Sequence, residues 1–411
     1  MKKRFFVLCV LGAAASAVQA QSNVALGGVV YANLKSYRVG NTTRAAVREL
    51  RVDDDFNSRF WVTGSEELGG GNSAIFYIEN RLNTDVNNVQ GTANGVSNGD
   101  TWVGLKGRWG QLTVGKHVFI GAQGVLSEFV NAAGGSGYAS LTSMPTSMLG
   151  TLSILDQFAG GYIDASSRTN NSIKYTSPDI NGLTAIVGMS TASAGNEGTL
   201  SCTGAGVTAL VTGTGLNPNG SISTNTTPTC PQLTVAANAA YSDGRQYFLQ
   251  GFYRNGPLLL TVGYRNNTVE GRIGADDRQA RFSGFYTLAT GLKIGGQLDR
   301  VSRIPTATGV SASRFAWAVP VSYQIGRGII LASYNRAGDY NGVANSGARM
   351  TSVGYDYALS KRTNLGIHYS KLSNDSGAAY QPFLAGSSFS GSGLLAGESA
   401  TTLALGLKHV F

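Results

Sequence analysis

The sequence predicts an all-β chain, a 16-stranded antiparallel β-barrel that spans a membrane. Three observations support this fold class: an export signal at the start, segments of about ten residues that alternate apolar and polar side chains, and a last segment, Thr401–Phe411, that ends on an aromatic residue. In that segment Leu403, Leu405 and Leu407 share one face. A strand with this pattern can place one face in lipid and the other in water.

The first twenty residues have the features of a signal peptide. Three basic residues, Lys2–Arg4, precede an apolar run over 5–17, and Val18–Ala20 supplies the small residues that a signal peptidase needs. The apolar run is too short for a membrane-spanning helix. We therefore expect residues 1–20 to be removed and residues 21–411 to form one outer-membrane barrel domain.

The composition indicates pleated strands and tight turns. The chain has 56 Gly and 18 Tyr, and only 13% of its residues are charged. Its formal net charge is +9, but Lys and Arg are spread singly along alternating segments, which argues against nucleic-acid binding. The three histidines, His117, His368 and His409, share no motif with a nucleophile and a carboxylate, so we expect no enzyme activity, and no cofactor or metal site.

Two cysteines remain after the predicted cleavage, Cys202 and Cys230. Both lie in a Ser/Thr/Asn/Gly-rich stretch, and we expect residues 191–244 to form a long external loop. Because exported proteins meet an oxidising compartment, we expect a disulfide, which would stabilise by roughly 3 kcal/mol on the chain-entropy model. The alternative is a pair of unpaired thiols on a loop.

Alternation between apolar and polar residues defines the strands in order along the chain. The predicted strands are 23–35, 58–64, 74–81, 101–106, 111–116, 172–175, 183–189, 246–254, 258–265, 280–288, 292–300, 314–323, 329–336, 350–359, 364–372 and 401–411. Residues 233–241 also look strand-like. A seventeenth strand would place the short turns on the external side of the membrane and the long loops on the periplasmic side, so we assign these residues to a hairpin arm within the long loop. A barrel of this size encloses a water-filled channel.

The alternation stops for about fifty residues between two of these strands. The unpatterned stretch, about 118–169, contains the flexible segment Gly134–Gly137 and a set of apolar residues that could anchor it to a wall. A segment of this length without strand pattern is more often functional than idle.

Several motifs resemble those of the trimeric general porins of Gram-negative bacteria, in particular the beta-proteobacterial and neisserial branch. The matching segments are Asn57–Phe60, Gly64–Gly71, Gly110–Lys116, Asn171–Pro178, Gly354–Thr363 and Gly406–Phe411. The resemblance implies a homotrimer in the outer membrane, in contact with lipid and lipopolysaccharide. It also implies that loop 118–169 folds inward to narrow the pore, and that Phe411 is a C-terminal assembly signal.

The function implied by this resemblance is passive diffusion of small hydrophilic solutes and ions. The expected pore-lining residues are Arg59, Arg81, Arg168, Lys174 and Lys116 on the wall, and Glu128, Asp156 and Asp164 on the inward loop. Alternation groups Lys116 with the apolar Leu112 and Val114, which argues against its place in this set. A basic wall facing carboxylates biases which ions pass, and we expect weak anion selectivity. Asp100 and Thr101 stand where relatives often carry a further Arg, which reduces that preference.

A second function of a different class is a surface binding or adhesion protein that uses the barrel as an anchor. The long stretch 191–244 is the feature that favours it, because exposed loops on a rigid scaffold often carry binding sites.

Overall fold

The computed structural model consists of β-strands and their connections. It describes residues 22–41, 43, 48–53, 58–82, 84, 99–117, 169–191, 214–216, 222–224, 245–268, 275–305, 312–382 and 393–411. Within these ranges, no helix is long and apolar enough to cross a membrane. The predicted signal peptide and the strand-like residues 233–241 lie outside the described residues.

The described strands extend the predicted ones by a few residues at most ends. They are β1 (Ser22–Gly40), β2 (Arg48–Asp53), β3 (Arg59–Gly69), β4 (Asn72–Arg81), β5 (Thr101–Gly107), β6 (Gly110–His117), β7 (Thr169–Thr176), β8 (Leu183–Ser190), β9 (Thr214–Leu216), β10 (Ile222–Thr224), β11 (Arg245–Asn255), β12 (Leu258–Thr268), β13 (Ala275–Thr287), β14 (Leu292–Pro305), β15 (Ala312–Ile325), β16 (Gly328–Ala337), β17 (Ala348–Ala358), β18 (Thr363–Asn374) and β19 (Ser399–Val410).

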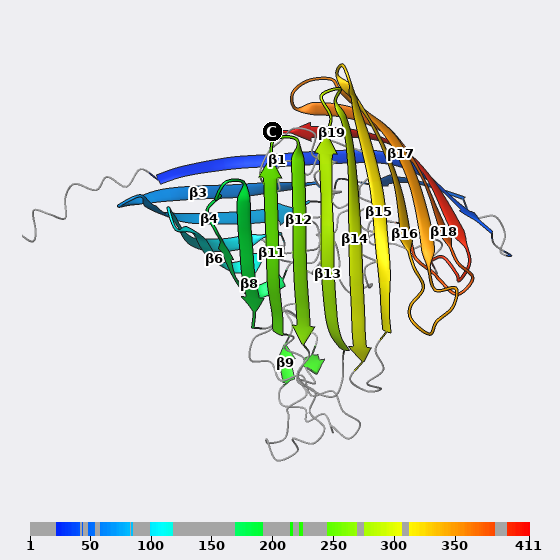
Figure 1. Ribbon diagram of the computed structural model, residues 1–411, viewed down its shortest axis with the longest axis horizontal. Helices are drawn as coiled ribbons and strands as arrows, with labels where there is room; N and C mark the ends of the chain where they lie inside the picture. Colours follow the sequence, from blue (N-terminus) through cyan, green and yellow to red (C-terminus); the bar gives the residue numbers. More distant parts are fainter. Residues whose placement is uncertain are drawn as a thin grey trace, which may run out of the picture.

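Apart from β9 and β10, the strands form one closed antiparallel sheet, in which β8 pairs with β11 and β1 pairs with β19 (Figure 1). Strands β2 and β3 pair with successive parts of β1, so together they occupy one position in the barrel. Strands β9 and β10 form a separate hairpin. The barrel therefore has 16 strand positions, which confirms the predicted number.

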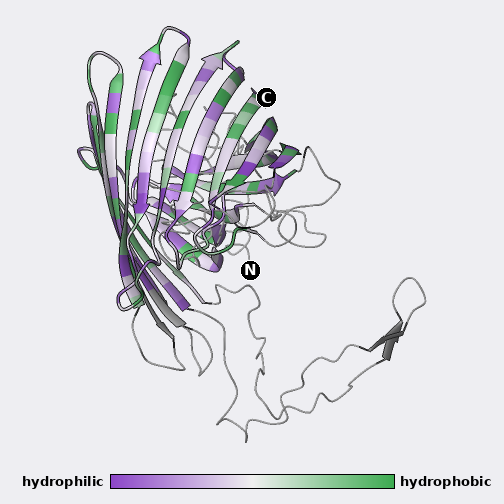
Figure 2. Cartoon of the chain, turned by 90° about the vertical axis from the view of Figure 1, so that its right-hand side faces the viewer, coloured by the Kyte–Doolittle hydropathy of each residue, from purple (hydrophilic) through white to green (hydrophobic). Residues whose placement is uncertain are grey.

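The two faces of the sheet differ in polarity and burial. Figure 2 shows hydrophobic and hydrophilic bands along the strands. In β19, Leu403, Leu405 and Leu407 are exposed on the outside, while Ala404 and Lys408 are buried on the inside. The same alternation continues around the barrel, because paired residues on neighbouring strands point to the same face. The predicted division into an apolar outer face and a more polar inner face is confirmed.

The two ends of the barrel differ in the length of their connections. One end has tight turns such as Gly69–Gly71, whose φ angles of 85°, 63° and 78° lie in the left-handed region that glycine tolerates. The long connections all lie at the other end. We call these the short-turn end and the long-loop end.

An apolar cluster lies on the inner face at the long-loop end. It includes Tyr37, Met350 and Leu372 from the wall, and Leu394 and Tyr380 from the connection between β18 and β19. The Tyr380 hydroxyl donates a hydrogen bond to the Ser346 carbonyl at 3.3 Å. The described parts of this connection are therefore packed against the inner wall.

The seam between β1 and β19 closes the barrel at the short-turn end. Gly28 and Phe411 exchange two backbone hydrogen bonds, with N···O distances of 3.1 and 3.0 Å. The Phe411 ring lies over Gly28, where an added Cβ would come within 2.1 Å of the ring. Glycine at this position makes room for the terminal aromatic residue.

Candidate pore lining

Three charged residues from neighbouring strands meet on the inner wall near the long-loop end of β3 and β4. Arg59 and Arg81 are cross-strand partners, and Glu79 lies two residues from Arg81 on the same face. The Glu79 carboxylate is 3.7 Å from Arg59 Nε and 3.3 Å from Arg81 Nε. Arg59 and Glu79 are fully buried, so both charges depend on their partners rather than on bulk water.

The surroundings of Glu79 hold its side chain in place. The Tyr77 hydroxyl donates to the carboxylate at 3.3 Å, and backbone hydrogen bonds join Glu79 to Gly99 and Asp100. Gly99 is required at its position, because a Cβ there would come within 2.5 Å of the Glu79 side chain. Asp100 stands where relatives often carry Arg. Its backbone hydrogen bond to Glu79 places it next to the charged residues Arg59, Glu79 and Arg81.

A polar row continues along the inner face into β6 and β7. His117 bonds through its two ring nitrogens to the hydroxyls of Ser172 and Thr113, at 2.7 and 2.9 Å. Lys174 is the cross-strand partner of Thr113 and faces the same side. The structure therefore places Lys174 on the inner wall, as expected from its alternation with Ile173.

Lys116 differs from the other expected pore residues. Gly115 and His117 both face inward, as residues two apart on a strand do, because the register shift in the pairing of β6 with β7 adds its extra residue on β7. Lys116 lies between them and pairs with Thr101, in the row that contains the exposed Val103 and Val114. The structure therefore places Lys116 on the outer face rather than in the pore.

A second charged cluster lies on the opposite wall, half-way round the barrel on β13 and β14. Arg281 Nε is 2.6 Å from the Asp299 carboxylate, and the side chains of Gln279 and Gln297 donate to the same carboxylate at 3.0 and 2.8 Å. Alternation alone could have identified Arg281, because it precedes the exposed Phe282. Arg281 is not among the pore-lining residues expected from the sequence.

The remaining expected residues fall outside the described part of the chain. They are Arg168, Glu128, Asp156 and Asp164, together with most of the expected constriction loop, and the two cysteines Cys202 and Cys230.

A closed barrel with an apolar outer face and charged side chains on its inner face is the architecture of a membrane channel protein. The family model for Gram-negative porins matches residues 7–377. The chain therefore belongs to the Gram-negative porin family, which confirms the resemblance found in the sequence.

Relatives from two bacterial groups match the chain. It is 25% identical to outer membrane porin protein 32 of Delftia acidovorans, over 100% of both chains. It is 31% identical to the major outer membrane protein P.IB of Neisseria lactamica over 118 residues, covering 28% of this chain and 33% of that protein.

Solved porin structures have the same fold. The anion-selective porin from Comamonas acidovorans superposes with a TM-score of 0.63 at 21% identity, covering 95% of this chain and 100% of the other. OmpT of Vibrio cholerae superposes with a TM-score of 0.57 at 12% identity, covering 95% and 98%.

Proposed function

We propose that this protein is a general diffusion porin of the outer membrane, which lets small hydrophilic solutes and ions cross passively. The observation that carries the proposal is the difference in polarity between the two faces of the closed barrel. Apolar rows lie on the outer face, and rows of Arg, Lys, Glu, Asp and Gln lie on the inner face. Membership of the Gram-negative porin family supports the same function. In this proposal the short-turn end faces the periplasm, and the protein carries out no catalysis.

The charges on the inner wall favour a weak preference for anions. Arg59, Arg81 and Lys174 supply positive charge, and we propose that they line the pore together with Arg168. Glu79 lies between two of these arginines and offsets part of their charge. Carboxylates of the inward loop, Glu128, Asp156 and Asp164, would complete a transverse field across the constriction.

Planar-bilayer recording tests this function. Purified protein should give large, stepwise conductance with a reversal potential that indicates a slight preference for anions in a salt gradient. Well-folded protein without conductance would refute the proposal.

Charge reversal on the inner wall tests the assignment of the pore. Arg59→Glu and Arg168→Glu should each shift the reversal potential toward cations, because each changes the local charge by two units. Arg349→Glu is the matched control, since Arg349 is exposed on the outer face of β17 and should leave the reversal potential unchanged. If neither inner variant shifts the potential, the constriction lies elsewhere.

We also propose that the protein forms a homotrimer. Strands β5, β6, β7 and β8 have 7, 8, 8 and 8 residues, fewer than the ~9–11 that a tilted strand needs to cross the hydrocarbon core. If this wall packs against further copies of the chain, its short strands do not have to span the hydrocarbon core in contact with lipid.

The processing and loop assignments complete the proposal. Residues 1–20 would be a cleaved signal peptide, Phe411 an assembly signal, and Cys202–Cys230 a disulfide within loop 191–244. A surface binding role for that loop is the alternative main function. A variant without the loop that conducts normally but no longer binds host cells would favour adhesion.

A further inference from the structure

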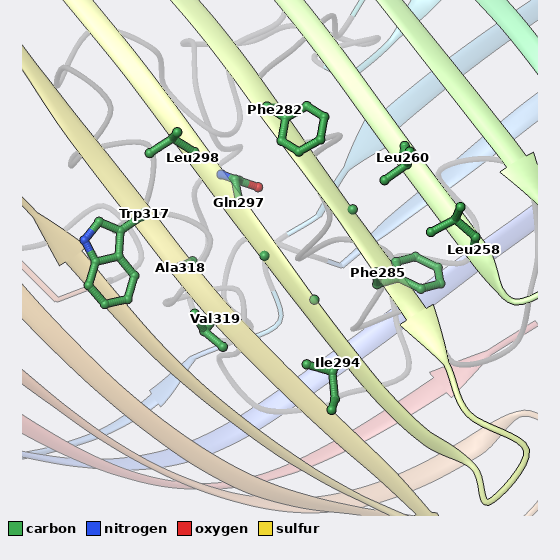
Figure 3. Close-up of a pocket in the computed structure, with 13 residues that line it drawn as sticks. Leu258, Leu260, Phe282, Phe285, Ile294, Gln297, Leu298, Trp317, Ala318 and Val319 are labelled. Carbon is green, nitrogen blue, oxygen red and sulfur yellow. The ribbon is translucent and has the colours of Figure 1, made fainter.

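A groove of about 470 Å³ crosses the outer face of strands β12 to β15 (Figure 3). Its outward-facing walls are hydrocarbon and aromatic side chains: Leu258, Leu260, Phe282, Ile294, Leu298 and Trp317. Gln297 also lines the groove, but its side chain is buried and donates to Asp299 on the inner face, so the outward-facing side chains are apolar and do not bind ions or water well. Any occupant must therefore be apolar where it touches the groove.

Two glycines on adjacent strands form the floor of this groove. Gly284 and Gly296 are cross-strand partners, and the pairing of β14 with β15 is interrupted at Gly296 and at Pro320, which has no N–H to donate. The Leu260 side chain lies over Gly284, whereas a Cβ added to Gly296 would meet nothing within 4 Å. Gly296 thus marks open space in the floor.

Two arginines lie on the same outer face toward the long-loop end. Arg300 is four residues beyond Gly296 on β14, about 13 Å along the strand, and Arg278 is its diagonal neighbour on β13. Both are exposed, and within the described part of the chain neither makes an ion pair. The Arg300 guanidinium lies 5.5 Å from the centre of the Phe315 ring.

The combination of an apolar groove with two cations at one end fits an amphiphile. We propose that this face binds a lipid of the outer leaflet, with one acyl chain in the groove over Gly296 and its anionic phosphate headgroup at Arg278 and Arg300. The inference rests on the outer-membrane placement proposed above. A second copy of the chain is the less suitable occupant, because β12 to β15 have 11 to 14 residues and are long enough to face lipid themselves.

Quenching of Trp317 fluorescence by brominated acyl chains tests this site. The full-length protein is placed in phosphatidylcholine vesicles that contain a small fraction of brominated lipid, either phosphatidylglycerol or phosphatidylcholine. The Trp317 signal is the difference between the wild type and Trp317→Phe, which keeps an aromatic ring in the wall. We expect the anionic lipid to be enriched at Trp317 about fivefold over the zwitterionic one.

Two sets of variants separate the headgroup from the chain. Arg278→Gln with Arg300→Gln should abolish the preference for the anionic lipid, whereas Arg349→Gln with Lys371→Gln, elsewhere on the outer face, should keep it. Gly296→Leu should reduce quenching by both lipids because it fills the groove. Its matched control is Ala185→Leu, which adds a leucine to the outer face of β8.

Four results would overturn the inference. The first three are equal quenching by both lipids in the wild type, an unchanged preference in the double arginine variant, and loss of the preference when inorganic phosphate replaces chloride at equal ionic strength. The third of these would mean that the arginines bind a free anion only. Absence of quenching by either lipid would show that another copy covers the groove, and would overturn it too. Conductance measured on the same samples separates these failures from failure of the porin function.

Discussion

The wall made by β5 to β8 and the wall made by β12 to β15 belong to one sheet but differ in height. The first has strands of 7 or 8 residues, and the second has strands of 11 to 14. Figure 1 shows the long strands β12 to β15 side by side, with the short strand β8 beyond β11. A membrane of uniform thickness cannot suit both walls equally.

The difference indicates that the two walls meet different surroundings. Both expose aliphatic side chains, such as Val103 on β5, 61% exposed, and Val262 on β12, 52% exposed. Hydrophobicity alone therefore does not distinguish a lipid-facing wall from a protein-facing one, since lipid tails and subunit interfaces both accept valine. Strand length does distinguish them.

The largest effect is expected on the long wall. Val262→Arg places a cation near the middle of a lipid-facing strand, which should lower the free energy of unfolding by about 2–4 kcal/mol. Urea titration of protein folded into lipid vesicles measures this loss. Val262→Leu is the control, and a variant as stable as that control would show that the long wall does not face lipid.

A smaller effect of another kind is expected on the short wall. Val103→Arg should weaken association of the copies at least tenfold, about 1.4 kcal/mol, and leave the conductance of each barrel intact. Light scattering and unheated gel electrophoresis report the oligomeric state, with Val103→Leu as the control. If Val103→Arg instead lowers folding stability as much as Val262→Arg and leaves the oligomer unchanged, the two walls share one environment.

The smallest effect is expected at the seam between β19 and β1. Phe411→Ala removes a ring that is about half exposed and packs on Gly28, so the unfolding free energy should fall by about 1 kcal/mol. Phe411→Tyr keeps the ring and should retain the stability. Equal stability of the alanine variant in urea titration would show that the ring does not stabilise the folded seam.

The number of strands and their faces could be predicted from the sequence because alternation is a local property. One strand is absent from the predicted set: Arg48–Asp53, between predicted strands 23–35 and 58–64, forms β2. Its Glu49 and Arg51 pair with each other on the inner face, while Leu50 and Val52 are exposed outside. The alternation was present, but its inner face is charged and so resembles a loop.

The contacts of the inner wall could be predicted only in part. Alternation placed Arg59, Arg81 and Lys174 inside, but it could not show that Glu79 lies between the two arginines or that Arg281 meets Asp299, because these contacts depend on the register between strands. For Lys116, alternation already groups the side chain with Leu112 and Val114, and the structure places it in that outer row.

The hydrogen bonds between Gly28 and Phe411 join the first strand of the barrel to its last. A protein with this closure has a high contact order, and its first strand keeps an open edge until the final one arrives. Folding therefore cannot proceed segment by segment during synthesis. Until β19 docks, the open edge of β1 can pair with other chains and aggregate.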